Sequence, residues 1–270
     1  MPSADPVVPP EPSATAPPAE PGLDDATTGR DLRRVVLHPR VAALLVTEIQ
    51  GLEALLGATA LEAPDRPQLL RRIAADYVEL EHAGAPEAVR RKASQRAIST
   101  YRKLVDDGRA DPRGDEVLYY LGLEYEHAGD AMNARRIFFE VIQKFPSSRY
   151  IPHAYLAFGE MFFEEASSDP SKWELARQAY LKVVEFPPRQ NDVYGYASYK
   201  LALALRNAGD TEHAAIAARH AVAFAAERPD LAGARVIAAR AESELGLTAG
   251  LPASGPLAPR TLDERAPAAE

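Results

Sequence analysis

The stretch of sequence that decides the fold is DEVLYYLGLEYEHAGDAMNARRIFFEVIQKFPSS, residues 115–148. Apolar residues recur in it at three- and four-residue steps, in one run before Gly129-Asp130 and in a second run after this pair. Such spacing predicts two amphipathic helices joined by a tight turn, and Pro146 marks the end of the second helix. The stretch therefore predicts a helix hairpin.

The same pattern recurs three more times between residues 67 and 227. In the stretch 115–148, Gly122 and Ala134 are small enough to let two helices approach closely, and the aromatic rings of Tyr125 and Phe138 would fill the space beside them. The corresponding residues are Leu70, Ile73, Ala74, Tyr77, Ala97, Tyr101 and Leu104 in the first unit, Tyr155, Phe158, Gly159, Phe162, Ala176, Tyr180 and Val183 in the third, and Leu201, Ala202, Leu205, Ala214, Ala218 and Ala221 in the fourth.

Two units are longer than the 34 residues of the stretch 115–148. The first carries extra residues around positions 84–86, and because proline suits the first turn of a helix, we expect both helices of this unit to be lengthened. The third carries extra residues at 167–170, which we expect to enlarge a loop. Insertions at turns leave the stacking faces of a repeat unchanged.

The remaining sequence divides into segments on either side of the repeats. Residues 1–38 are predicted to form a disordered proline-rich tether, because such a composition buries too little apolar surface to offset the entropy of ordering. Residues 39–66 are predicted to form an N-terminal amphipathic helix and a linker, and residues 67–228 the repeats. Residues 229–246 predict a capping helix with one polar face, and residues 247–270 a disordered tail.

The N-terminal helix is expected between residues 39 and 56 and has two interpretations. Val41, Leu45, Ile49, Leu52 and Leu56 form one apolar stripe on it. In the first interpretation this stripe packs against the first repeat and covers its open end. In the second it forms a short dimerising coiled coil, for which two heptads give little support.

Composition excludes several classes of function. The net charge of −8 disfavours a general nucleic-acid binder, because phosphate contacts need a concentrated basic surface. The paired arginines at 33–34, 71–72 and 135–136 stand beside acidic residues and are interpreted as solvated helix faces. There is no cysteine for disulfides, thiolate catalysis or cysteine-based zinc sites. No apolar run approaches the roughly 20 residues that span a bilayer, so no membrane insertion is expected.

No motif for catalysis or for a cofactor is present. The six histidines form no His-Glu-x-x-His arrangement, and there is no glycine-rich phosphate loop or nucleophile elbow. Glu160, Glu164 and Glu165 cluster on a helix surface, whereas paired catalytic carboxylates need a dry pocket. We therefore expect no catalytic residue, no cofactor and no metal, and we expect that the chain is not an enzyme.

With its 34-residue period and series of four units, the chain resembles the tetratricopeptide repeat (TPR) family, over residues 67–227 and most closely over 115–188. The resemblance implies an all-α fold: a right-handed α-solenoid of about four helix pairs with capping helices and disordered tails. The chain is also similar to TPR proteins of bacterial cell envelopes, which share the Lys-Phe-Pro stop seen at 144–146. Those proteins carry a signal or a lipid-anchoring cysteine, and the chain has neither.

The first residues of the sequence set the expectation for where in the cell the protein is located. Met1-Pro2-Ser3 does not open a basic-then-apolar leader, so a cytoplasmic location is the default expectation. A periplasmic or envelope location is expected if the true start lies upstream.

In the TPR family the first helix of each pair lines the concave face, where an extended or helical peptide binds. Tyr119 and Tyr199 could instead pack against neighbouring helices, and Glu126, Glu160 and Glu164 could be ordinary solvated charge. The lysine–asparagine clamp of chaperone-tail binders is missing at the matching positions. The positions that the resemblance assigns to the groove are Tyr119, Glu126, His153, Glu160, Phe163, Glu164, Tyr196, Tyr199, Arg206 and Asn207.

The expected function is that of a non-catalytic scaffold which binds another protein or peptide in its concave groove, in a bacterial envelope assembly or elsewhere. The alternative is a dimeric regulatory module that senses a partner and uses the N-terminal helix as its dimeriser. The sequence leaves the oligomeric state open, a monomer included.

Overall fold

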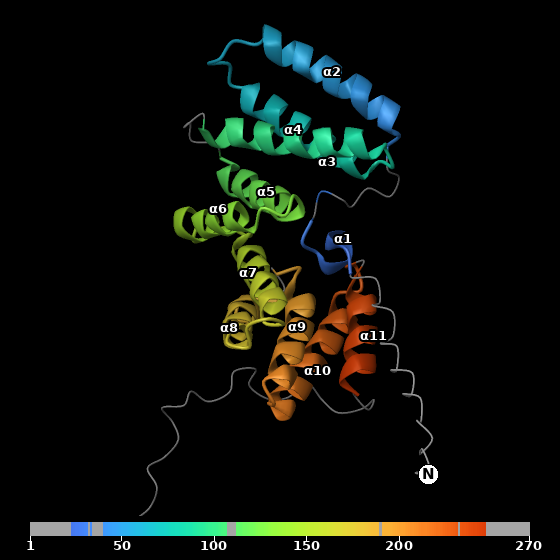
Figure 1. Cartoon of the computed structure of the whole chain (residues 1–270), viewed down its shortest axis with the longest axis vertical. Helices are drawn as coiled ribbons and strands as arrows, with labels where there is room; N and C mark the ends of the chain where they lie inside the picture. The colour runs from blue at the N-terminus through green and yellow to red at the C-terminus, as the bar shows by residue number, and fades with distance from the viewer. Residues whose placement is uncertain are drawn as a thin grey trace, which may run out of the picture.

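The computed structural model describes residues 23–31, 33, 40–106, 112–188, 191–231 and 233–246. These residues form helices and connecting turns, and no strand occurs among them. Figure 1 shows the helices stacked along one long axis. Their bounds are α1 Asp25–Thr28, α2 Ala42–Ala58, α3 Arg66–His82, α4 Glu87–Asp106, α5 Gly114–His127, α6 Ala131–Lys144, α7 Ile151–Glu165, α8 Lys172–Val184, α9 Tyr194–Asn207, α10 Thr211–Glu227 and α11 Ala234–Leu245.

The stack is built from four helix pairs, α3–α4, α5–α6, α7–α8 and α9–α10, and each pair rests on the next. The predicted all-α repeat fold is thereby confirmed. The first pair has the long helices that its insertion predicted, 17 and 20 residues against 14 each in α5 and α6. The insertion in the third unit lies in the loop between α7 and α8, as expected.

A glycine beneath an aromatic ring lets the helices of two pairs approach closely. A Cβ atom built on Gly122 would lie 2.7 Å from the ring of Phe138, and one on Gly159 would lie 2.4 Å from the ring of Tyr180. In the fourth pair Ala202 and Ala218 occupy the matching positions, and both are buried. The fourth pair has its own close approach more than one helix turn away, where a Cβ atom built on Gly195 would lie 2.8 Å from the ring of Phe224.

The turns within the second and fourth pairs share one local structure. Gly129 and Gly209 have φ angles of 76° and 83°, a left-handed conformation that glycine adopts without steric cost. Asp130 and Asp210 then cap the following helices, because their carboxylates accept hydrogen bonds of 3.1 Å from backbone amides three residues on. The Gly-Asp dipeptides therefore both end one helix and start the next.

Helices flank the four pairs at both ends of the stack. At one end α2 packs on the first pair through Leu45 and Ile49, in agreement with the first interpretation of this helix. At the other end α11 packs against α9 and α10, and Ile237 and Ala241 join their apolar core. The right-handed twist of the stack stays a prediction.

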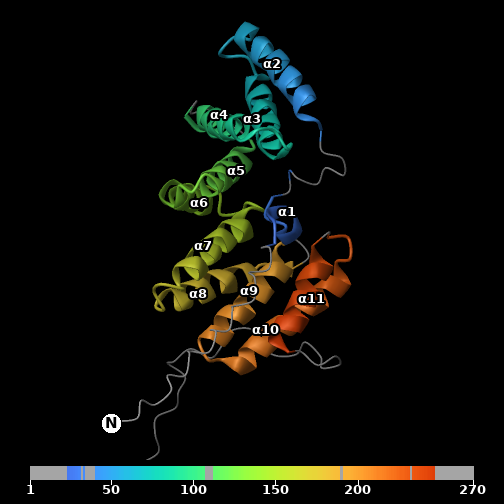
Figure 2. The ribbon, with the colours of Figure 1, turned by 45° about the vertical axis from the view of Figure 1, so that its right-hand side comes forward.

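The predicted tether differs from the structure over residues 23–31 and 33, which we call the N-terminal segment. This segment contains the short helix α1, and it lies between α5, α7 and α11 in both views of the molecule (Figures 1 and 2). It is ordered because its polar groups are paired with the helices it crosses. The rest of the predicted tether, residues 1–22, 32 and 34–38, and the predicted tail at 247–270 lie outside the described residues.

Candidate docking site on the first helices

The backbone of the N-terminal segment closely approaches the start of α11 and the loop before α9. A Cβ atom built on Gly233, just before α11, would lie 1.5 Å from the carbonyl oxygen of Thr27. Gly29 has a φ of 79°, and a Cβ atom on it would lie 3.3 Å from the carbonyl oxygen of Asp192. Residues with side chains would not fit at position 233 without moving the segment. The contact therefore depends on a glycine from each side.

Arg30 is the first anchor of the segment. Its guanidinium donates hydrogen bonds from Nη2 to both carboxylate oxygens of Glu126 on α5, at 2.7 and 2.6 Å. The hydroxyl of Tyr119, also on α5, donates a 2.7 Å hydrogen bond to the carbonyl oxygen of Arg30. The Arg30 side chain also pairs with Asp25, at 3.2 Å. One arginine thus fixes the segment to α5 through both its main chain and its side chain.

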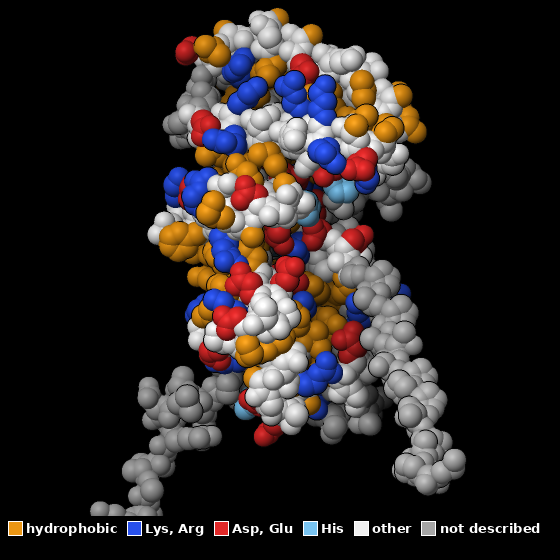
Figure 3. Space-filling view, in the orientation of Figure 1, with side chains coloured by type: hydrophobic (Ala, Val, Ile, Leu, Met, Phe, Trp, Pro, Cys, Tyr) orange, Lys and Arg blue, Asp and Glu red, His pale blue; other side chains and the backbone are white. Residues whose placement is uncertain are grey.

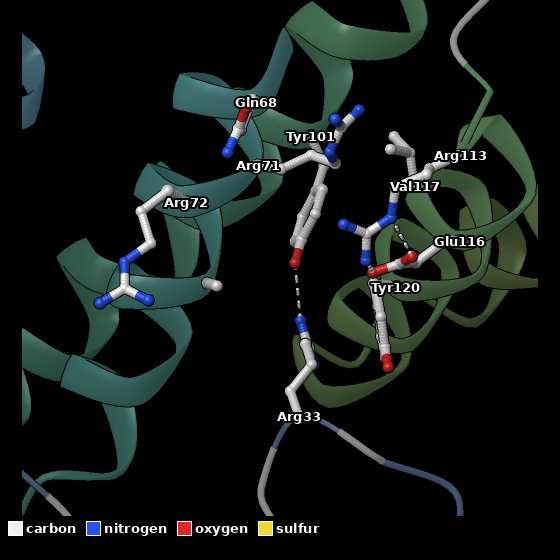
Figure 4. A pocket seen from close by; sticks show the side chains of 10 residues that line it. Arg33, Gln68, Arg71, Arg72, Tyr101, Arg113, Glu116, Val117 and Tyr120 are labelled. Carbon is white, nitrogen blue, oxygen red and sulfur yellow. Dashed lines mark hydrogen bonds and ion pairs between the residues drawn. The ribbon is translucent and has the colours of Figure 1, made fainter. Parts of the chain in front are cut away.

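Arg33 is the second anchor, and all three nitrogens of its guanidinium donate hydrogen bonds. Nη2 donates a 2.6 Å hydrogen bond to Glu124 on α5, and Nη1 donates one of 3.0 Å to the hydroxyl of Tyr101 on α4. Nε and Nη2 bind the two carboxylate oxygens of Asp31, at 3.0 and 2.9 Å. The guanidinium carbon lies 4.1 Å from the centre of the Tyr120 ring, within range of a cation–π contact. Figure 4 shows Arg33 reaching upward between α3 and α5 toward Tyr101.

The face that receives these arginines is acidic. Glu124 is fully buried, and burial together with the charge of Glu124 raises the pKa of nearby Glu81 on α3. Burial alone would lower the pKa of Arg30, but the carboxylates of Glu126 and Asp25 outweigh it and raise that pKa. Figure 3 shows acidic side chains gathered where α5, α7 and the segment meet. The site therefore selects positive charge.

His127 adds a titratable contact at the edge of the site. Its Nε2 lies 2.5 Å from a carboxylate oxygen of Asp25. Burial would lower the pKa of His127, but the hydrogen bond to Asp25 and the charges of Glu124 and Glu126 raise it. From α3, the ring of His82 faces the His127 ring at 6.4 Å.

We call the residues that contact the segment's two arginines, Tyr101, Tyr119, Tyr120, Glu124 and Glu126, the docking site. Of the ten residues predicted for the groove, Tyr119 and Glu126 belong to it. His153 lies beside it on α7, buried, with its ring 5.4 Å from that of Tyr119. Burial lowers the pKa of His153 to about 4, so this histidine is neutral near pH 7.

A second group of predicted residues forms a cluster between α7 and α9. Glu160 accepts hydrogen bonds from the hydroxyls of Tyr180 and Tyr196, at 2.6 and 3.0 Å, and pairs with Lys200. Phe163 packs edge-on against Trp173 on α8, and the Lys200 ammonium lies 3.7 Å from the centre of its ring. Glu164 is exposed.

The last predicted residues lie on α9, and two of them face α11. The hydroxyl of Tyr199 donates a 2.8 Å hydrogen bond to the carboxylate of Glu244, and Arg206 donates one to the carbonyl oxygen of the same residue. Asn207 binds the carbonyl oxygen of Leu203 within its own helix. Tyr199 thus packs against a neighbouring helix, which was the alternative weighed for it.

Sequence reasoning missed Tyr101, Tyr120, Glu124 and both arginines of the segment. The interpretation of Arg33 as part of a solvated helix face is wrong, because its side chain is held between α4 and α5. One signal was present in the sequence: the eight prolines of the tether end at residue 21, and residues 22–38 contain none. The boundary of the proline-rich region therefore lies earlier than predicted.

No metal site or membrane span is found among the residues that the structure describes. They contain no group of three or more histidines and carboxylates that could hold a metal ion. None of the described helices is long and apolar enough to cross a bilayer.

Stacked helix pairs, with the N-terminal segment lying against one face of the stack, define a helical-repeat protein of the solenoid class. The tetratricopeptide repeat family model matches residues 116–148, the part of the chain that forms α5 and α6. The match supports the tetratricopeptide repeat assignment that the resemblance implied. No curated protein matches the chain.

Proposed function

We propose that the chain is a non-catalytic scaffold that binds an extended segment of another protein at the docking site. A TPR repeat is typical of protein–protein interaction scaffolds. The observation that carries the proposal is that the N-terminal segment of the chain already lies on this face, held by a main-chain hydrogen bond to Tyr119 and by ion pairs to Glu124 and Glu126. A segment of another chain that presents the same groups can make the same contacts in place of the N-terminal segment.

Charge supports the choice of this face. Glu124 and Glu126 lie two residues apart on α5. Glu81 on α3 is close enough to Glu124 for the charge of Glu124 to raise the pKa of Glu81. Like charges held together at a partly dry surface repel one another, and a basic ligand relieves this repulsion. A scaffold with such a site selects partners by positive charge.

Affinity capture with the full chain tests the proposal. We expect Glu126→Arg to abolish capture of partners that the wild-type chain retains, because the reversed charge repels a basic ligand. Glu140→Arg on α6 is the matched control, since Glu126 and Glu140 side chains are 23% and 21% exposed and both pair with basic residues. Equal capture by the wild type and both variants would show that partners do not bind at the docking site.

A second candidate, a dimeric regulatory module, is favoured by exposed apolar side chains on α2 and at the residue just before it. Val41, Leu44 and Leu55 are 61%, 60% and 51% exposed. Light scattering of the full chain tests this candidate: a dimer that becomes a monomer in Leu44→Ser/Leu55→Ser would support it, and a wild-type monomer would exclude it. The envelope location stays a prediction and plays no part in either proposal.

A further inference from the structure

The contacts of Arg33 distinguish arginine from lysine. The planar guanidinium binds Asp31, Glu124 and the Tyr101 hydroxyl from three different nitrogens, while its face lies over the Tyr120 ring. A lysine ammonium is a single charged centre and cannot make this set of contacts together. The pocket around Arg33 is therefore an arginine pocket.

Arg30 adds a second requirement at a fixed spacing. Its two hydrogen bonds to Glu126 come from one nitrogen, and its carbonyl oxygen is bound by Tyr119. Asp31 lies between the two anchors and orients Arg33 through both of its carboxylate oxygens. The recognised pattern, read from residues 30–33, is Arg-Asp-x-Arg.

The segment is held at these anchors and does not fill the space around them. A cavity of about 270 Å³ adjoins Arg33 between α3, α4 and α5, and its wall includes Gln68, Tyr101 and Val117. On its other side, beside the close contact at Gly233, a cavity of about 210 Å³ lies between the segment and α9, α10 and α11, lined by Tyr196, Phe224 and other residues. Segments with few continuous apolar contacts open more readily than a packed core.

Resting on the function proposed above, we propose that the docking site recognises an Arg-Asp-x-Arg segment in its partner, and that residues 30–33 of the chain occupy the site until the partner displaces them. The occupant and the partner then compete for the same carboxylates, Glu124 and Glu126. A tethered occupant has a high effective concentration, so it lowers the apparent affinity of every partner.

A peptide with the sequence of residues 22–36 is the probe for this competition, labelled with fluorescein and titrated by anisotropy against the full chain. The variant Arg30→Ala/Arg33→Ala removes both anchors of the occupant and leaves every residue of the docking site in place. We expect the peptide to bind this variant at least tenfold more tightly than the wild type, because its competitor is weakened. The peptide should also raise the melting temperature of the variant.

Two controls locate the binding and identify the group recognised. Adding Glu126→Arg to the double variant should abolish peptide binding, whereas adding Glu140→Arg should leave it unchanged. A peptide in which both arginines are lysine should bind the double variant at least tenfold more weakly.

Equal affinity of the peptide for the wild type and the double variant, or no binding to the double variant, would overturn the inference. Equal binding of the lysine and arginine peptides would overturn the assigned pattern. Each of these results would leave the proposed function standing if Glu126→Arg still abolished capture of partners. If Glu126→Arg left the capture of partners unchanged while the peptide bound as expected, only the proposed function would be contradicted.

Discussion

His153 shows how the surroundings of one residue set the pH dependence of the fold. The side chain lies beside Tyr119 and Tyr150, and burial lowers its pKa to about 4, from an ordinary value near 6.5. Because the folded pKa is the lower one, the unfolded chain binds the proton more readily. The contribution of neutral His153 to stability is therefore present above pH 6.5 and is lost as the pH falls toward 4.

We expect the wild-type chain to lose about 2 kcal/mol of unfolding free energy through His153 between pH 7 and pH 5. In His153→Phe this part of the loss should disappear, since phenylalanine fits the aromatic surroundings and does not titrate. Urea unfolding at the two pH values measures the difference. Equal losses in the two proteins would show that His153 is not buried in neutral form.

His127 predicts the opposite trend for the N-terminal segment. Asp25, Glu124 and Glu126 raise its pKa despite burial, so the protonated form favours the docked segment. The added stability is fully present below about pH 6.5 and is lost as the pH rises through the raised pKa. We expect the peptide of residues 22–36 to bind Arg30→Ala/Arg33→Ala more tightly at pH 6 than at pH 8 in an anisotropy titration.

His127→Gln is the control for this effect, because glutamine keeps a hydrogen-bond donor and carries no charge. In that background the pH dependence of peptide binding should be reduced. An unchanged pH dependence would mean that other groups near the site titrate instead.

At the level of the element, the paired helices depend on glycine where an aromatic ring crosses. Gly122→Ala would place a Cβ atom 2.7 Å from the Phe138 ring, so we expect a loss of about 1–3 kcal/mol from overpacking. Gly51→Ala is a matched control within α2, where a Cβ atom meets nothing within 4 Å. It should stabilise the chain by about 0.5–1 kcal/mol through helix propensity. Chemical denaturation measures both, and similar effects would contradict the packing described.

Phe138 and Phe139 give a second test of the same helix pair. Phe138 is fully buried between α5 and α6, whereas Phe139 is 51% exposed. We expect Phe138→Ala to cost about 3–5 kcal/mol through lost burial and a cavity, and Phe139→Ala to stay within about 0.5 kcal/mol of the wild type. Circular dichroism melts of the two variants would show the contrast, and equal melting temperatures would mean that the helix register is wrong.

Most helices could be predicted from the sequence because their apolar residues repeat with the period of a helix. The end of α6 at Lys144, before Pro146, follows from local chemistry alone. The N-terminal helix, expected at 39–56, occupies Ala42–Ala58. Helix α1 could not be predicted in this way, since four residues have no periodicity and its order comes from contacts made elsewhere in the chain.

At the level of the whole molecule, the face of the docking site was predictable and its occupant was not. The family resemblance assigned Tyr119 and Glu126 to the concave face of the stack, and in the structure both contact Arg30. The contact between Arg30 and Glu126 joins residues 96 positions apart, and no local pattern encodes such a pairing. Glu124 was missed for the same reason, because its partner Arg33 lies 91 positions away in the sequence.

The most direct test of the account is amide hydrogen exchange of the N-terminal segment in the full chain. The amides of Thr28 and Asp31 donate 3.0 Å hydrogen bonds to the carbonyl oxygens of Asp24 and Asp25. We expect these amides to exchange slowly in the wild type. We also expect them to lose protection in Gly233→Ala, whose Cβ would meet the Thr27 carbonyl, while α5 and α7 keep theirs. Exchange of residues 24–33 in the wild type at the rate of an unstructured peptide would contradict the account.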